Sequence, residues 1–283
     1  MQDQQALNIG CNLQNLTQGW ASRDTLNNSR DVSLYFLKDK RRELGNFFCS
    51  FFVEDYIKQP CIPEIFAYNF CLLNNKQDLL PDISLLGAFQ TYAVSLYDLI
   101  EDKHFTRHGE KTLLGKIGIK KTIYLRKLCE SIFLKKAKKL EKKKKNNALK
   151  LSLEQYLLTL AADSLRNKKE ILPPPQALTL QDLLAGMPTE KIALLCGGNI
   201  ELCQLAKSLG NSLSTLDDLI DLLLLEDVNK KKTTIPLSYL NYFNIKGKSK
   251  EEIRDNFINS DAFLTTLDYI YLNLFKSRNI LKK

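Results

Sequence analysis

The chain has 283 residues, of which 44% are apolar, enough for a substantial buried core in one large domain. Glycine (12) and proline (8) are sparse while leucine and lysine are abundant, which predicts an all-α protein and argues against a sheet protein. The formal net charge is +9, but eight lysines lie within 135–145. Because no aromatic residues interleave with them, this run predicts a solvated helix end or loop, and we expect no nucleic-acid partner.

Cysteine usage and the apolar pattern indicate the cellular compartment in which the protein is expected. The seven cysteines are odd in number and lack the paired spacing of metal sites, which favours reduced thiols. The polar N-terminus has no charged-then-apolar signal pattern, and no stretch has the uninterrupted apolar length that a membrane helix needs. We therefore expect a soluble, cytoplasmic protein without a transmembrane segment.

In chain order, residues 1–30 are rich in Asn and Gln and predict a loosely ordered N-terminal tail, followed by a single domain over 31–283. From Val32 onwards apolar residues recur at three- and four-residue intervals, the spacing of amphipathic helices. Pro173-Pro174-Pro175 and Gly197-Gly198 separate neighbouring helices. The helices expected from this pattern cover 32–57, 62–75, 81–104, 112–142, 148–168, 177–196, 199–226, 232–243, 249–257 and 260–280.

An acidic cluster lies near the end of the helix predicted over 81–104. Asp98 and Asp102 are four residues apart, so an α-helix places both carboxylates on one face, about 6 Å apart along its axis. Arg107 follows shortly afterwards, and a guanidinium can bind phosphate oxygens through two hydrogen bonds. The alternative is a helix end with ordinary surface ion pairs. His104 and His108 are also four apart, but a third soft metal ligand is missing nearby.

A second acidic cluster occurs in the helix predicted over 199–226. Asp217 and Asp221 present two carboxylates on one face, Asp218 directly follows Asp217, and Lys232 comes after the cluster. A solvated helix face is again the alternative, but two acid-then-base segments in apolar helices make a coincidence improbable. Two such faces form an oxygen-rich site suited to Mg²⁺, which commonly bridges carboxylates to substrate phosphates.

The order and spacing of these residues resemble the trans-prenyl diphosphate synthase family. Its first motif reads Asp-Asp-x-x-Asp and is followed by Arg-Arg-Gly, and Asp98, Asp102 and Arg107 occupy those places, with Leu99 replacing the second Asp. Its second motif and the Lys-x-Thr-x-Pro after it are matched by 217–221 and 232–236. The other matching positions are Pro63, Thr112, Gly118 and, as the Lys of a Lys-Thr pair, Lys191.

The resemblance implies an all-α, single-domain helical bundle around a central apolar cavity. It also implies that Mg²⁺ is the cofactor, that an allylic prenyl diphosphate is the substrate, and that the protein is a homodimer. Its metal ligands would be Asp98, Asp102, Asp217 and Asp221, with Asp218 as a further catalytic residue. Its diphosphate-binding residues would be Arg107, Lys232 and Lys191.

The departures from the family concern its second substrate, isopentenyl diphosphate. The family binds it with basic residues and a histidine, and the corresponding positions here read Gln59, Pro60, Ile62, Thr91 and His108. This loss favours a terpene synthase, in which the allylic cation is folded and quenched without an isopentenyl unit. A trans-prenyltransferase, acting on isopentenyl diphosphate or another acceptor, is the first alternative, and a regulatory subunit of a heteromeric synthase is the second.

Overall fold

The computed structural model describes residues 67, 70–71, 74–107, 110–144, 147–167, 170–225 and 233–281. The tail predicted over 1–30 and the helix predicted over 32–57 lie outside these residues. So does most of the helix predicted over 62–75, of which Ala67, Phe70 and Cys71 are described and helical.

The described chain forms two compact units. The first, which we call the α5–α7 unit, contains the described part of 67–160 together with Lys191–Gly198. The second, the α11–α14 unit, contains Ala161–Glu190 and Asn199–Lys283. The single domain over 31–283 stays a prediction.

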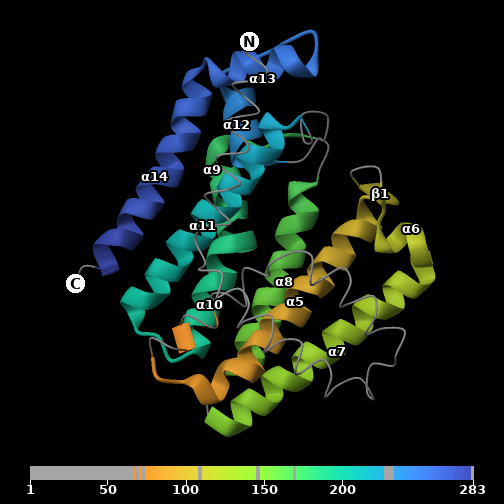
Figure 1. Cartoon of the computed structure of the whole chain (residues 1–283), viewed down its shortest axis with the longest axis vertical. Helices are drawn as coiled ribbons and strands as arrows, with labels where there is room; N and C mark the ends of the chain where they lie inside the picture. The colour runs from red at the N-terminus through yellow and green to blue at the C-terminus, as the bar shows by residue number, and fades with distance from the viewer. Residues whose placement is uncertain are drawn as a thin grey trace. The chain divides into compact units, whose positions relative to one another are not determined.

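The α5–α7 unit is built around two long helices that run side by side (Figure 1). Its core is a cluster of buried apolar side chains from α5, α6, α7 and α8, in which Phe89 and Phe133 are fully buried. Burial of such side chains contributes about 1.5–3 kcal/mol each to folding. Its elements are η1 (Gln77–Leu79), α5 (Leu80–Glu101), β1 (Thr106–Arg107), β2 (Glu110–Lys111), α6 (Leu113–Ile117), α7 (Ile119–Lys144) and the first part of α8 (Ala148–Arg166).

The helix predicted over 112–142 is two helices in the structure. Gly118 ends α6 with a φ of +77°, a left-handed conformation that glycine adopts without steric cost. The chain therefore turns at this residue before α7 begins.

In the α11–α14 unit, α11 packs along α14, and α12 also contacts α14 (Figure 1). Asn199, Thr234 and Ser249 cap the N-termini of α11, α12 and α13 by accepting backbone hydrogen bonds. A buried apolar cluster centred on Leu219 and Phe257 forms its core. Its elements are α9 (Pro174–Gln181), the π-helical segment η2 (Asp182–Gly186), α10 (Met187–Leu195, which ends in the other unit), α11 (Ile200–Leu223), α12 (Ile235–Tyr242), α13 (Lys250–Ile258) and α14 (Asp261–Leu281).

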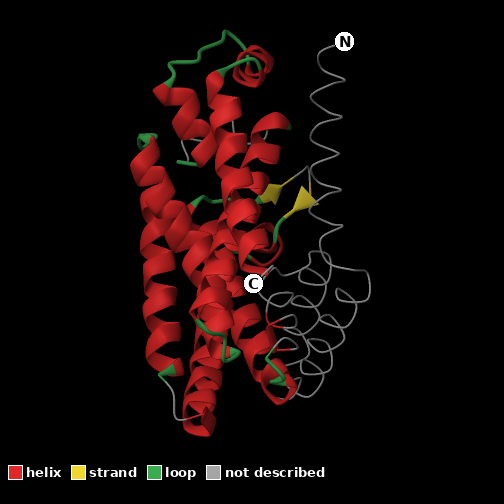
Figure 2. Ribbon diagram, turned by 90° about the vertical axis from the view of Figure 1, so that its left-hand side faces the viewer, coloured by secondary structure: helices red, strands yellow, loops and turns green. Residues whose placement is uncertain are grey.

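The all-α prediction is confirmed. The described strands are two-residue segments, β1 and β2, which pair antiparallel as a short hairpin (Figure 2). Among the described helices, none combines the length and apolarity needed to cross a bilayer. The described cysteines, which are Cys71, Cys129, Cys196 and Cys203, are buried free thiols.

The described part of the lysine run, residues 135–144, is helical and occupies the last turns of α7. Two of its members, Lys136 and Lys139, lie 3.3 and 3.6 Å from the buried carboxylate of Asp82, and Lys143 lies 3.8 Å from Asp78. Part of the run thus pairs with acidic residues at the start of α5 and in η1 just before it, which fits the predicted helix end.

Candidate active site

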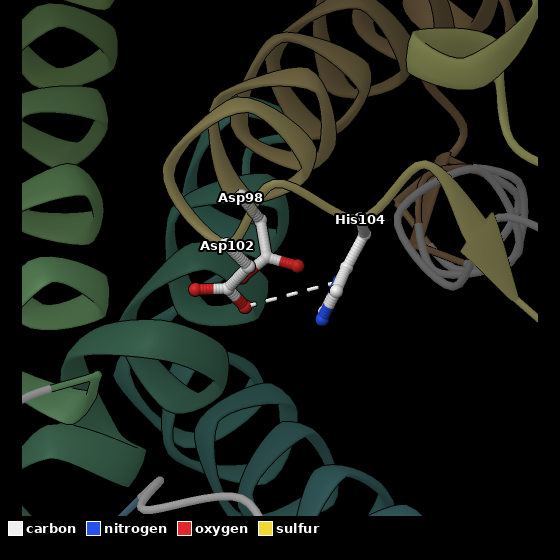
Figure 3. Close-up of side chains that lie close together, drawn as sticks. All are labelled: Asp98, Asp102 and His104. Atoms are coloured by element: carbon white, nitrogen blue, oxygen red, sulfur yellow. Dashed lines mark ion pairs between the residues drawn. The ribbon is translucent and has the colours of Figure 1, made fainter.

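The first acidic motif lies on the last turn of α5. The side chains of Asp98 and Asp102 lie next to each other, and the ring of His104 lies beside them (Figure 3). One potential ligand atom from each of these three residues lies within 4.8 Å of the others. His104 Nδ1 is 3.9 Å from Asp102 Oδ2. All three side chains are partly exposed, so an ion from solvent can reach them.

The way in which α5 ends places His104 beside the carboxylates. Lys103 has a φ of +52°, and its N–H donates to the carbonyl of Ile100 at 3.3 Å. The N–H of His104 donates to the carbonyl of Leu99 at 3.1 Å. This pair of hydrogen bonds is a Schellman motif, which turns the chain back over the helix end.

The donor set of this motif fits a hard divalent cation. Two carboxylates at one helix end supply oxygen ligands, which Mg²⁺ prefers. The ion typically retains water at its other coordination positions. His104 is a ligand candidate that the sequence did not predict, because the spacing along the chain pairs its imidazole only with His108. Its proximity depends on the left-handed residue Lys103, which no helical pattern reveals.

The hairpin after α5 positions Arg107, whose backbone in β1 pairs with Glu110 in β2. The N–H of Thr112 donates to the carbonyl of Phe105 at 3.0 Å, and its hydroxyl donates to the carbonyl of His104. A Cβ at Gly115 would lie 2.1 Å from the Phe105 carbonyl oxygen, so this close approach requires glycine. The side chain of Arg107 lies outside the described structure, and its role in diphosphate binding stays a prediction.

The second acidic motif lies in the last two turns of α11. Asp218 is 4% exposed, and its carboxylate pairs with the guanidinium of Arg166 at the end of α8. Asp217 is exposed and Asp221 is partly exposed. The three carboxylates are therefore not equivalent: Asp218 is held by an internal cation, while Asp217 and Asp221 lie where solvent reaches them.

The segment after the second motif is anchored at the start of α12. Lys232 lies outside the described residues, but the next residue, Thr233, is buried, and its N–H donates to the carbonyl of Arg166 at 2.7 Å. Thr234 caps α12 by accepting from the N–H of Leu237 at 3.3 Å. The chain on the C-terminal side of Lys232 is thus fixed by two consecutive threonines.

Lys191, the third predicted diphosphate ligand, lies on α10 and is 7% exposed. Its ammonium nitrogen donates to the side-chain carbonyl of Gln90 on α5. Burial lowers the pKa of Lys191 from 10.5 to about 7, because the charged form loses its hydration. A neighbouring anion would raise this pKa again and so restore the positive charge of Lys191.

The lowered pKa of Lys191 predicts a pH-dependent stability. Between pH 7 and pH 10.5 the unfolded chain holds a proton that the folded chain lacks, so the unfolding free energy rises with pH through this window. The gain is at most about 1.4 kcal/mol for each pH unit. The unfolding free energy of Lys191→Met should lack this increase with pH. The difference in unfolding free energy between the wild type and the variant should therefore grow as the pH rises from 7 to 10.5, and urea denaturation measures it.

Exposed Lys150, on α8, provides the matched control. Its ammonium remains in water on folding, and the pH profile of Lys150→Met should run parallel to that of the wild type. Parallel profiles for Lys191→Met as well would mean that Lys191 is not buried as described. Loss of the hydrogen bond to Gln90 shifts the unfolding free energy of Lys191→Met at every pH. The slope of the unfolding free energy against pH is therefore the quantity to compare.

Solved structures with this arrangement of helices identify the fold. A decaprenyl diphosphate synthase from Rhodobacter capsulatus aligns with 92% of this chain and 91% of its own, with a TM-score of 0.74 at 11% identity. A polyprenyl synthase from Caulobacter crescentus CB15, solved with calcium and isoprenyl diphosphate, aligns over 93% and 92%, with a TM-score of 0.72 at 14% identity. This is the fold of the trans-prenyl diphosphate synthases.

A third prenyl synthase has the same fold. An octaprenyl pyrophosphate synthase from Helicobacter pylori aligns with 99% of this chain and 94% of its own, with a TM-score of 0.63 at 16% identity. No family model and no curated protein sequence matches the chain. The fold predicted from the two acidic motifs is therefore confirmed, while the roles of the individual site residues stay predictions.

Proposed function

We propose that the protein is a Mg²⁺-dependent trans-prenyltransferase that ionises an allylic prenyl diphosphate and transfers the prenyl group to an acceptor. The observation that carries the proposal is the pair of neighbouring carboxylates, Asp98 and Asp102, at a helix end within a prenyl synthase fold. The neighbour solved with calcium and isoprenyl diphosphate supports a divalent cation and a prenyl diphosphate as ligands.

In this proposal Asp98, Asp102, Asp217 and Asp221 would hold Mg²⁺. The cations would supply Lewis-acid stabilisation of the negative charge that develops on the leaving group. Arg107, Lys232 and Lys191 donate hydrogen bonds to the diphosphate oxygens. The allylic C–O bond then breaks, its electron pair leaves with the diphosphate, and an allylic cation remains.

Capture of the cation distinguishes the two candidate functions. In a chain-elongating prenyltransferase, the double bond of isopentenyl diphosphate attacks the cation, and the adduct loses a proton to give a longer allylic diphosphate. The folds of the neighbouring prenyl synthases favour this outcome. Thr91 and His108, which replace family residues for isopentenyl diphosphate, instead favour a terpene synthase or another acceptor.

Product analysis separates these functions. The purified protein is incubated with Mg²⁺ and geranyl, farnesyl or geranylgeranyl diphosphate, with and without isopentenyl diphosphate, and hydrocarbons and diphosphates are both analysed. Longer diphosphates that form only when isopentenyl diphosphate is present would support the prenyltransferase. Hydrocarbon or alcohol formed without it would support the terpene synthase.

Two further outcomes bear on the proposal. Turnover that appears only when a second synthase subunit is added would favour the regulatory-subunit alternative. If the protein releases pyrophosphate from none of the three allylic diphosphates, either alone or with a second synthase subunit, the proposed function is contradicted.

A further inference from the structure

We infer that His104 is a third protein ligand at the first acidic motif and raises the affinity of this site for divalent transition metals relative to Mg²⁺. The inference rests on the proposed function and deepens it, because it concerns the cation at one of the two motifs. The family resemblance assigns that cation to Asp98 and Asp102 alone. The placement of an imidazole beside these two carboxylates comes from this chain's own sequence and backbone.

The three side chains supply two kinds of metal ligand. Carboxylate oxygens suit hard cations such as Mg²⁺ and Ca²⁺. A neutral imidazole nitrogen suits first-row transition metals, for which histidine is the commonest protein ligand. The two carboxylates still bind Mg²⁺ without help, so the proposed Mg²⁺-dependent reaction does not require His104. A transition metal in the same place gains a coordinate bond from it.

His104 lies within reach of an ion shared with the carboxylates. One ligand atom from each of Asp98, Asp102 and His104 lies within 4.8 Å of the others (Figure 3), and His104 Nδ1 is 3.9 Å from Asp102 Oδ2. Neighbouring ligand atoms of an octahedral ion lie about 3 Å apart, because each bond is about 2.1 Å long. The side chains of His104 and Asp102 are 32% and 21% exposed, so both have room for the adjustment of about 1 Å that a shared ion requires.

Backbone hydrogen bonds hold His104 beside the end of α5. Its N–H donates to the carbonyl of Leu99 at 3.1 Å, and its carbonyl accepts from the hydroxyl of Thr112. The carbonyl of the next residue, Phe105, accepts from the N–H of Thr112 at 3.0 Å. A ligand whose backbone is already fixed loses little conformational entropy when it binds an ion, so His104 is preorganised for this role.

The alternative is an ordinary ion pair between protonated His104 and Asp102. In the ion pair the imidazole is not bonded to the metal, so the two cases differ in whether a nitrogen atom ligates the bound ion. The sequence makes this difference measurable, because His104 and His108 are its only histidines. A nitrogen signal from imidazole can therefore come from just two side chains.

Pulsed electron paramagnetic resonance of bound Mn²⁺ detects a directly bonded imidazole nitrogen. The full chain, without a histidine tag, is loaded with Mn²⁺ in the presence of inorganic pyrophosphate. The wild type should show the nitrogen modulation, His104→Ala should lose it, and the matched control His108→Ala should keep it. Because the side chain of His104 is partly exposed, its truncation should leave the fold intact, and His104→Gln, which keeps more of the bulk, should show the same loss.

Calorimetry with Co²⁺ and Mg²⁺ measures the preference of the site. The titrations use a background of Asp217→Asn with Asp221→Asn, which removes the second acidic motif as a competing site. His104→Ala should weaken Co²⁺ binding by at least about 10-fold, the loss that follows even when an outer-shell partner of a metal site is removed. Its Mg²⁺ affinity should stay close to that of the unsubstituted background, because Mg²⁺ takes oxygen ligands.

The outcomes separate this inference from the proposed function. Bound Mn²⁺ without nitrogen modulation, or modulation that depends on His108, would overturn the role of His104 alone. Equal losses of Co²⁺ and Mg²⁺ affinity in His104→Ala would also overturn it, since the imidazole would then not distinguish the two ions. Wild-type protein that binds no Mn²⁺ in the presence of pyrophosphate would overturn the proposed function and this inference together.

Discussion

Replacing Asp98 with asparagine is expected to slow the Mg²⁺-dependent release of pyrophosphate from an allylic diphosphate by about 10³-fold, the scale observed when a preorganised group that stabilises transition-state charge is removed. Asparagine has nearly the same shape as aspartate, so the fold should persist while one negative ligand is lost. Asp98 and Asp102 lie at the same helix end, and one neutral side chain disrupts the pair. The rate is measured by coupled detection of pyrophosphate at saturating substrate.

Glu101 provides the control for this substitution. It is an exposed carboxylate on the same last turn of α5 and is not one of the three clustered residues. Glu101→Gln removes the same charge and should keep a rate close to that of the wild type. An unchanged rate in Asp98→Asn, or an equal loss in Glu101→Gln, would contradict the assignment of Asp98 as a metal ligand.

The second large effect is expected on stability, from Gly210→Ala in the middle of α11. A Cβ at this position would lie 2.1 Å from the hydroxyl oxygen of Thr189 and 2.6 Å from the carbonyl oxygen of Ala185. Thr189 is buried, and its hydroxyl donates to the carbonyls of Ala185 and Gly186 at 2.7 and 2.9 Å, so it is not free to rotate away.

The clash should outweigh the better helix propensity of alanine. Alanine gains about 0.5–1 kcal/mol over glycine inside a helix. Overpacking of a closed contact costs about 1–3 kcal/mol and sometimes more, and here one of the clashing atoms belongs to the backbone. We therefore expect Gly210→Ala to lower the unfolding free energy by about 2 kcal/mol, as measured by urea denaturation.

Gln204→Ala is the matched substitution on the same helix. Gln204 is exposed, so alanine there should leave stability unchanged or raise it slightly. Equal or greater stability of Gly210→Ala would show that α11 does not approach the π-helical segment η2 as closely as described.

The elements that the sequence predicted best are those governed by local periodicity. The apolar spacing located α5, α8 and α11 to within a few residues, and the four-residue spacing of Asp98 and Asp102 predicted that their carboxylates would lie together. A helical repeat is a property of neighbouring residues, so it can be read without knowledge of the rest of the fold.

The features that the sequence did not predict depend on backbone conformation or on distant residues. The break at Gly118 and the turn at Lys103 both require positive φ angles, and the apolar pattern runs across the first of them without interruption. The ion pair of Arg166 with Asp218 joins residues far apart in the sequence, and no sequence motif links the two. His104 approaches the carboxylates only because the Schellman motif turns the chain back.

A crystal structure with Mn²⁺ and a non-reactive thiolodiphosphate analogue of farnesyl diphosphate is the decisive test of our proposal that both acidic motifs bind divalent cations and one diphosphate. Anomalous scattering from Mn²⁺ should appear at Asp98 and Asp102 and at Asp217 and Asp221, with every ion bound to oxygens of the same diphosphate. Mn²⁺ at only one of the two motifs, or a diphosphate bound away from both of them, would contradict the proposed function.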